Sequence, residues 1–304
     1  MLAAIRSFFH LHGVLEVETP VLSAAAASDP AIESLETCCQ GPGAPAGGRM
    51  YLHTSPEFAM KRLLAAGSGP IYQICRVFRD DESGRRHNPE FTLLEWYRPA
   101  YDHHQLMEEV EALLLSVLPA PRPVSRFSYR ELFQRHLGID PHSASADSLR
   151  RLANERGIEV NRSLDCKDAW LDLLLSHCIE PRLAGSGLCF VHDYPASQAS
   201  LARVELGDPP LAARFECYLD GVELANGFHE LADAGEQRRR FQHDLEIRQH
   251  SGGKLPPLDE RLLAALQFGL PDCAGVALGI DRLLMQITGA DHIDQVLTFP
   301  LERA

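Results

Sequence analysis

The pattern of hydrophobic and polar positions is clearest in residues 71–97, where two apolar segments of strand character flank a charged loop. A strand over residues 71–78 would place Ile71, Gln73, Cys75 and Val77 on one face, and residues 91–97 are rich in aromatic and branched side chains, which favours a strand. A tight hairpin needs only a two-residue turn, whereas long charged loops in compact domains are usually functional. We therefore expect part of a functional site here. The polar side chains of this loop are Arg79, Asp80, Asp81, Glu82, Arg85, Arg86, His87, Asn88 and Glu90.

The rest of the chain shows the periodicities of both helices and strands. Apolar spacings of three and four, together with capping residues and terminating glycines, predict helices. Asp220-Gly221 is a strong turn signal and predicts a hairpin over residues 214–228. Residues 23–49 are rich in alanine, glycine and proline and are expected to form a loop. The predicted helices cover residues 1–12, 56–66, 102–118, 129–136, 145–156, 168–178 and 258–268, with one more inside 229–249 and one after residue 279, and further strands are predicted at 14–17, 188–192 and 275–278.

Composition narrows the class of protein. The 304 residues are 45% apolar and 23% charged, which is ordinary for a globular protein of one large domain or two smaller ones. No apolar run is long enough to span a bilayer, and no cleavage signal follows the first residues, so a cytoplasmic protein without membrane contact is expected. Eight cysteines without a C-x-x-C pair argue against a zinc ribbon or a disulfide framework. The net charge of −13 disfavours a broad nucleic-acid-binding face.

The loop in residues 79–90 and the strand after it suit the binding of a nucleotide. Arg79 directly follows a strand, so a rigid element can aim its planar fork at a phosphate. The amide of Asn88 can read a base edge, and Phe91 offers a flat face for stacking. The strand period of two places Phe91, Glu95 and Tyr97 on one face, where they could line one pocket. A solvated hairpin loop explains the same charges equally well.

Two further segments carry acidic side chains that could bind ligands. At the start of one helix, capping explains Ser55 and Pro56, and an acid such as Glu57 is favoured in a first turn. On the hairpin, Glu216 and Glu223 lie on opposite arms and could together bind Mg²⁺ through two oxygens. The alternative is that both are exposed strand acids.

A strand, a glycine and a helix follow one another near the C-terminus. Gly279 allows a ligand to approach the backbone closely, and Arg282 adds a cation at the first turn of the helix. An ordinary strand-to-helix turn with a surface arginine is the alternative. The region 126–185 reads as three short helices, and no catalytic constellation is recognised in it.

Three segments together resemble the motifs of class II aminoacyl-tRNA synthetases, in the version found in lysyl-tRNA synthetases. GVLEVETPVL resembles motif 1 (about 5–22), FRDDESGRRHNPEFTLLEWY resembles motif 2 (about 71–97), and GVALGIDRLLM resembles motif 3 (about 275–289). Asp81 stands where motif 2 usually has a glutamate. The resemblance implies an α+β catalytic domain over residues 1–304, with an antiparallel sheet flanked by helices, a helical insertion at 126–185 and a homodimer formed through motif 1.

The resemblance also implies formation of an aminoacyl-adenylate from ATP with Mg²⁺, and it assigns roles to residues. Arg79 and Arg282 would act in catalysis, and Glu216 and Glu223 would hold the metal. The ATP-binding residues would be Arg79, Asp80, Asp81, His87, Asn88, Phe91, Glu223, Leu224, Gly279 and Arg282. The residues that bind the amino-acid substrate would be Ser55, Pro56, Glu57, Glu95, Tyr97, Asn226, Glu230 and Ala277.

Finer details are similar to the elongation factor P–lysine ligases, stand-alone relatives of lysyl-tRNA synthetases. These details are FHELADA, LLEWYRP and Ala277, where lysyl synthetases typically have glycine. The resemblance implies activation of (R)-β-lysine and its transfer to a lysine of elongation factor P. Motif 1 begins at the start of this sequence, so neither an anticodon-binding barrel nor a tRNA partner is expected. The alternatives are a truncated synthetase that activates L-lysine for another acceptor, and a non-catalytic paralogue that acts as a binding module.

Overall fold

The computed structural model of the chain describes residues 1–80, 82–160, 164 and 166–304. Asp81, the departure from the usual motif 2, lies outside the described residues. The strands run β1 (Leu15–Glu16), β2 (Leu22–Ser23), β3 (Glu36–Cys38), β4 (Arg49–Leu52), β5 (Ile71–Phe78), β6 (Glu90–Pro99), β7 (Val124–Ser128), β8 (Leu188–Pro195), β9 (Val204–Glu205), β10 (Leu211–Leu219), β11 (Val222–His229) and β12 (Cys273–Gly279).

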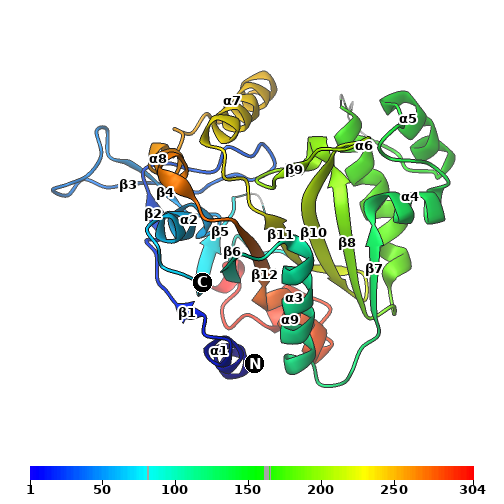
Figure 1. Cartoon of the computed structure of the whole chain (residues 1–304), viewed down its shortest axis with the longest axis horizontal. Helices are drawn as coiled ribbons and strands as arrows, with labels where there is room; N and C mark the ends of the chain where they lie inside the picture. Colours follow the sequence, from blue (N-terminus) through cyan, green and yellow to red (C-terminus); the bar gives the residue numbers. More distant parts are fainter. Residues whose placement is uncertain (81, 161–163, 165) are drawn as a thin grey trace.

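The helices join these strands and cover both faces of the main sheet (Figure 1). Short 3₁₀ turns and one π turn accompany them. The α-helices run α1 (Leu2–Leu11), α2 (Glu57–Ala65), α3 (His103–Val117), α4 (Tyr129–Leu137), α5 (Ala146–Glu155), α6 (Lys167–Leu174), α7 (Ala234–Ser251), α8 (Glu260–Gly269) and α9 (Ile280–Thr288).

The main sheet has the order β1-β5-β6-β12-β11-β10-β8-β7, with β9 paired to β10. Most neighbours are antiparallel, as predicted, but β1 pairs with β5 and β7 pairs with β8 in parallel. The sheet is therefore mixed at both edges. This arrangement places β6, β11 and β12, which carry eight of the predicted site residues, in the centre of the sheet.

One face of the sheet packs against α1, α3 and α9. Along β6, Leu94 and Trp96 point into this core, and Val276 and Leu278 of β12 do the same. Phe9 of α1 stacks on Tyr72 of β5 with ring centroids 4.3 Å apart. Because strand side chains alternate, the neighbouring residues of β6 and β12 must face the other side of the sheet.

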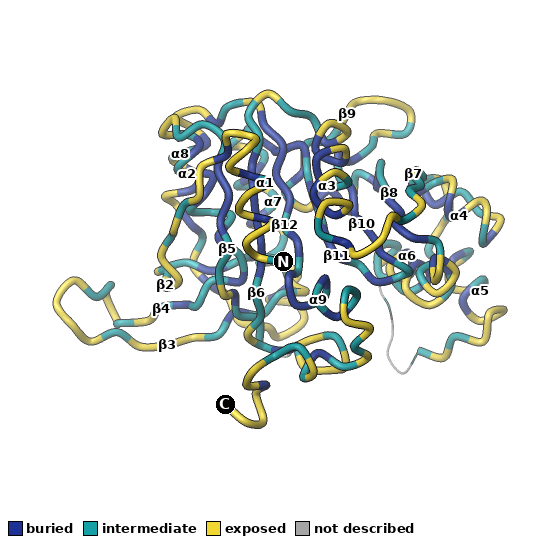
Figure 2. Tube along the Cα trace, turned by 90° about the horizontal axis from the view of Figure 1, so that it is seen from below, coloured by how far each residue is buried: buried dark blue, intermediate teal, exposed yellow. Residues whose placement is uncertain are grey.

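The other face has two separate covers. Helices α2, α7 and α8 form an apolar cluster with one end of the sheet, and α4, α5 and α6 pack on β8 and β10 at the other end. Figure 2 shows the buried central strands and, projecting beside them, the exposed loop between β3 and β4. The sheet between the two covers is left to form the floor of a cavity.

The structure corrects the prediction in two places. Residues 23–49 are not entirely loop, because β3 lies within them and pairs with β4 in a small sheet of three strands. Helix α2 begins at Glu57 with Pro56 as its N-cap, one residue later than predicted. Ser55 still acts at this end, because its hydroxyl accepts a hydrogen bond from the Glu57 backbone N–H at 3.0 Å.

The region 126–185 contains the three predicted helices, α4, α5 and α6. Ser128 and Ser145 cap the first two through their hydroxyl groups. Helix α6 continues from Leu174 into a π turn and a 3₁₀ turn that ends at Leu183. No described helix combines the length with the apolar character that crossing a bilayer requires.

Candidate active site

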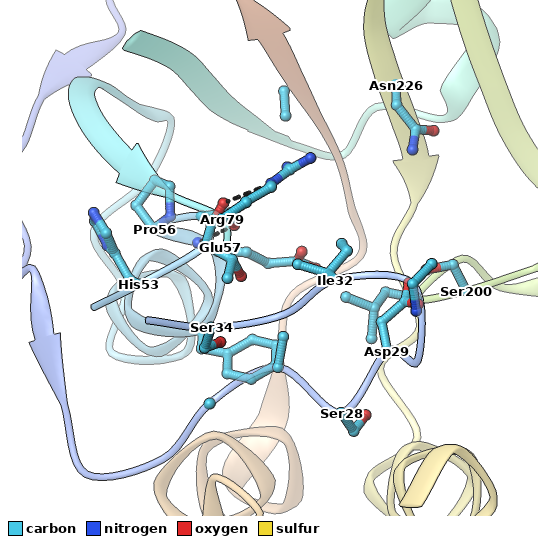
Figure 3. A pocket seen from close by; sticks show the side chains of 18 of the residues that line it. Ser28, Asp29, Ile32, Ser34, His53, Pro56, Glu57, Arg79, Ser200 and Asn226 are labelled. Atoms are coloured by element: carbon cyan, nitrogen blue, oxygen red, sulfur yellow. Dashed lines mark hydrogen bonds between the residues drawn. The ribbon is translucent and has the colours of Figure 1, made fainter. Parts of the chain in front are cut away.

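A cavity of about 1480 Å³ lies between the two covers, with β6, β11 and β12 in its floor. This volume exceeds that of most small-ligand pockets, so a nucleotide and a second substrate can fit side by side. Figure 3 shows side chains that reach it from the 28–34 loop, from the start of α2 and from Asn226 on β11. The predicted site residues that line it are Ser55, Pro56, Glu57, Arg79, His87, Asn88, Phe91, Glu95, Tyr97, Glu223, Leu224, Asn226, Glu230, Ala277, Gly279 and Arg282. Of the described candidates, Asp80 and Glu216 are not part of this lining.

Three carboxylates from three different elements meet at one end of the cavity, which we call the acidic end: Glu57, Glu95 and Glu230. The residues Glu95 and Glu230 are 1% and 2% exposed. Lys61, one turn after Glu57 on α2, places Nζ 2.6 Å from a carboxylate oxygen of Glu57 and 2.6 Å from one of Glu230. Tyr97 donates its hydroxyl hydrogen to Glu95 at 2.7 Å. Three acids with one ammonium group form a pocket that favours a second cation.

The excess of acid is visible in the pKa values. Burial, and after it the charge of Glu57, raises the pKa of Glu95 to about 8. Burial also raises the pKa of Glu230 to about 7, although Lys61 acts against it. Burial on its own would lower the pKa of Lys61, but the carboxylates of Glu230 and Glu57 raise it. Near neutral pH, Glu95 and Glu230 are therefore ready to ionise when a positively charged group enters.

Small residues on β12 make room for this pocket. A Cβ atom at Gly275 would lie 2.3 Å from the Tyr97 ring and 2.5 Å from a carboxylate oxygen of Glu230, so a larger residue would displace both groups. Ala277 pairs with Glu95 of β6 and with Asn226 of β11. Its methyl group therefore adjoins the acidic end and limits the space there.

The other end of the cavity, which we call the basic end, contains two arginines. Arg79 follows β5 and contacts the Thr54 carbonyl oxygen and the Glu82 carboxylate, each at 3.3 Å. Arg282, in the first turn of α9, contacts the Glu223 carboxylate at 3.3 Å. Charge-assisted hydrogen bonds are usually shorter, about 2.7–2.9 Å. Both guanidinium groups are thus positioned but retain the capacity to bind a stronger acceptor such as a phosphate.

Neighbouring groups hold these arginines in place. Burial and the charge of Arg282 lower the pKa of His87, so its neutral ring can accept a hydrogen bond from Arg282, 2.6 Å away. The guanidinium group of Arg79 lies over the Phe91 ring, 5.2 Å from its centroid. A Cβ atom at Gly279 would contact only the Arg282 side chain, at 3.8 Å or more, so the space above this glycine is open for a ligand.

Asn88 is engaged within the protein. Its Nδ2 donates to the Glu90 carbonyl oxygen at 2.7 Å, and its Oδ1 accepts from the Leu301 backbone N–H at 3.3 Å. These bonds tie the motif 2 loop to the C-terminal segment. A contact between Asn88 and a nucleotide base stays a prediction.

The two acids predicted to bind metal are brought to the same face by an irregularity in the hairpin. Glu216 pairs with Asn226, but a bulge after Cys217 shifts the register so that Tyr218 pairs with Glu223. Without this shift, Glu223 would pair with Leu219 and face the opposite side of the sheet. Glu216 is largely buried and accepts hydrogen bonds from Arg214 at 2.6 Å and from Tyr218 at 2.5 Å. Carboxylate oxygens suit Mg²⁺, and the metal-binding role of this pair stays a prediction.

Residues 1–303 match the family described as class II tRNA synthetases (D, K and N). The chain belongs to this family. It is 50% identical to proteins named elongation factor P--(R)-beta-lysine ligase from Edwardsiella ictaluri (strain 93-146) and Pectobacterium atrosepticum. It is 49% identical to a protein of the same name from Klebsiella pneumoniae (strain 342). Each alignment covers 100% of this chain and 94% of the relative.

Some residues of this class II site were not found from the sequence. Lys61 is four residues after Glu57, a spacing that indicates a helical ion pair and could have drawn attention to it. Asp172 of α6 also lines the cavity, and Gln198 donates a hydrogen bond to it at 2.7 Å. Burial raises the pKa of Asp172 to about 6. The insertion thus supplies part of the cavity wall, which no local pattern in residues 126–185 indicates.

Proposed function

We propose that this chain activates (R)-β-lysine with ATP and transfers it to the ε-amino group of a lysine of elongation factor P. The observation that carries the proposal is one cavity with a buried acidic end and a basic end, in a chain that aligns along its whole length with ligases of that name. The acidic end suits a substrate with two ammonium groups. The basic end suits a triphosphate.

The substrate would bind with its ammonium groups among Glu57, Glu95 and Glu230. Because Glu95 and Glu230 are buried, a bound ammonium group loses its water shell and gains strong charge-assisted hydrogen bonds instead. Ser55, Pro56, Tyr97, Asn226 and Ala277 would shape the space around it. The carboxylate of the substrate would then point towards the basic end, where Arg79 can neutralise it.

In the first reaction, a substrate carboxylate oxygen would attack the α-phosphorus of ATP, and the bond to the diphosphate leaving group would break. Arg79 would stabilise the charge at the α-phosphate, and Arg282 would bind the distal phosphates beside Gly279. Glu216 and Glu223 would hold Mg²⁺, which neutralises phosphate charge when bound. No general base is needed, because the carboxylate is already ionised at neutral pH.

In the second reaction, a neutral lysine amine of the acceptor protein would attack the carbonyl carbon of the adenylate. An amide bond forms, the bond between the carbonyl carbon and the phosphate oxygen breaks, AMP leaves, and one proton of the amine is released to water. Transfer requires the acceptor lysine to reach the cavity from outside, and the cavity is open to the surface. All eight cysteines of the chain are free thiols, which fits a cytoplasmic enzyme.

We also propose a homodimer formed through residues 1–22. Leucine side chains are unusually exposed in this segment, with Leu11 82% and Leu15 58% exposed. Leu2, Val21 and Leu22 add to the same exposed set. A second copy of this segment would cover these side chains. We expect no tRNA partner, because the net charge of −13 gives little attraction for its phosphates.

The first test is ATP–diphosphate exchange with (R)-β-lysine and with L-lysine, followed by mass analysis of elongation factor P after incubation with enzyme, ATP and the preferred amino acid. The proposal expects faster exchange with (R)-β-lysine and a mass increase on one acceptor lysine. Preference for L-lysine, or exchange without transfer to that protein, would contradict the substrate or the acceptor respectively. Absence of exchange with either amino acid would contradict the enzyme assignment.

A further inference from the structure

Histidine and acidic side chains from α3 and β8 come together outside the active-site cavity. His103 and His104 lie in the first turn of α3, and Asp193 lies on β8 next to His192. None of these four residues lines the active-site cavity. The cluster is therefore separate from the residues to which the proposed reaction assigns a role.

The geometry of three of these side chains suits a single metal ion. His103, His104 and Asp193 each offer one ligand atom, and these atoms lie within 4.8 Å of one another. The rings of His103 and His104 have centroids 4.0 Å apart. His103 is buried whereas His104 is exposed, so an ion could enter from the solvent side.

The inner histidine lacks the partners that a buried polar group normally has. His103 is 1% exposed, and neither of its ring nitrogens makes a hydrogen bond to any described residue. A carboxylate oxygen of Asp193 lies 3.6 Å from Nε2, which is longer than a hydrogen bond. Buried polar atoms without partners are costly, so this site calls for a ligand that completes it.

We propose that His103, His104 and Asp193 bind one divalent transition-metal ion of the zinc class. Two imidazole nitrogens and one carboxylate oxygen form a ligand set that Zn²⁺ accepts, with water as the fourth ligand, and that Mg²⁺ disfavours. The ion links α3 to β8, which is the strand on which the helical insertion packs. Its role is to stabilise this junction, not to take part in adenylate formation.

His192 lies beside the proposed ligands. Its Nδ1 is 2.9 Å from the second carboxylate oxygen of Asp193 but makes no hydrogen bond to it, so this histidine adjoins the ligand set from outside.

A second set, His103 with Glu205 and His229, also has ligand atoms within 4.8 Å of one another. His229 already lies 3.0 Å from Asp272, and Asp272 is also paired with Arg203. Glu205 is exposed. His229 is thus already engaged by Asp272. For this reason we assign the metal to His103, His104 and Asp193.

Zinc titration of the metal-free, tag-free full chain by calorimetry tests the proposal. The exposed or half-buried thiols Cys38 and Cys39 should first be changed to serine, because adjacent thiols bind zinc themselves. We expect one Zn²⁺ per chain, a higher Tm with zinc, and visible absorption of a low-symmetry site when Co²⁺ replaces it. Excess Mg²⁺ should not compete.

Matched variants locate the site. His104→Gln and Asp193→Asn should each weaken zinc binding by at least about 10-fold, while ATP–diphosphate exchange in Mg²⁺ stays unchanged. His192→Gln should weaken binding less than these two. Glu205→Gln is the control and should bind as the parent does. Absence of stoichiometric binding, or an equal loss in Glu205→Gln, would overturn the proposal.

Discussion

The two ends of the cavity are built in different ways. At the acidic end, Glu95 and Glu230 are buried and fixed by a central strand and by the end of β11, and Lys61 joins Glu57 to Glu230 at 2.6 Å. At the basic end, Arg79 and Arg282 lie after the end of a strand and at the start of a helix, and their contacts with carboxylates are 3.3 Å long.

This difference indicates how the two substrates are recognised. A small amine needs a rigid, desolvated pocket that rejects wrong shapes, because its few atoms supply little binding energy. A triphosphate supplies several charged oxygens, so it can order partly exposed arginines as it binds. Mutations at the acidic end should therefore alter substrate affinity and selectivity, and mutations at the basic end should alter the chemical step.

The largest expected effect is at the basic end. Arg79→Ala should lower kcat for ATP–diphosphate exchange by about 10²–10³-fold, because it removes a cation that acts on the charge of the transition state. The free energy of unfolding should change little, since the contacts of Arg79 are long and partly exposed. Steady-state kinetics and urea unfolding check both statements.

Arg76→Ala is the matched control for this prediction. Arg76 lies on the same strand, β5, and its exposed side chain pairs with exposed Glu90. Its loss should leave exchange unchanged. If Arg79→Ala raised KM for ATP without lowering kcat, the basic end would act in substrate affinity and not in the chemical step, which would contradict this comparison.

The next effect is at the acidic end. Glu230→Gln should raise KM for (R)-β-lysine by about 10- to 100-fold, because one charge-assisted contact with the ammonium group is lost. KM for ATP should stay near its original value. Glu90→Gln, an exposed acid on β6, is the control. Equal changes in KM for both substrates would show that Glu230 supports the whole cavity instead of one end.

The sequence predicts the strand-borne part of this site better than the part that depends on tertiary contacts. The period of two places Phe91, Glu95 and Tyr97 on one face, and the structure confirms this. The hairpin at Asp220-Gly221 is also confirmed. Local patterns suffice here, because every second residue of one strand faces the same side wherever the strand lies.

The remaining features depend on how distant segments meet. The bulge that turns Glu223 towards the face of Glu216 has no clear signal in the residues around Cys217. Asp172 reaches the cavity only because the insertion packs on β8 and β10. The whole insertion lies between His103 and Asp193 along the chain, so no spacing rule brings the two side chains together.

A smaller effect concerns selectivity at the acidic end. Ala277 pairs with Glu95 and Asn226, so its methyl group adjoins the position proposed for the substrate amine. Ala277→Gly should lower the preference for (R)-β-lysine over L-lysine by about 10-fold, since one methyl group is worth about 1–3 kcal/mol in a pocket. Ala274→Gly, on the same strand but facing the opposite core, is the control for backbone effects. An unchanged ratio of kcat/KM values would contradict the role of this methyl group.

The smallest effect is a pH dependence confined to the acidic end. Glu95 and Glu230 have pKa values raised to about 8 and about 7, so both carboxyl groups lose protons as the pH rises from about 6 to about 8.5. KM for (R)-β-lysine should fall several-fold over this range, because the ionised carboxylates bind ammonium groups more strongly. KM for ATP should change less, and Glu95→Gln should flatten the dependence for the amine.

The same protons make folding stability depend on pH with a fixed sign. Above the pKa of an unfolded glutamate, the folded chain holds protons that the unfolded chain has released, so stability falls as the pH rises through the raised pKa values. A bound ammonium group offsets this loss by neutralising the ionised acids. The rise in Tm caused by (R)-β-lysine should therefore be larger at about pH 8.5 than at about pH 6, with Glu90→Gln as the control. A rise in Tm that is equal at both pH values would show that the substrate amines bind elsewhere than at the acidic end.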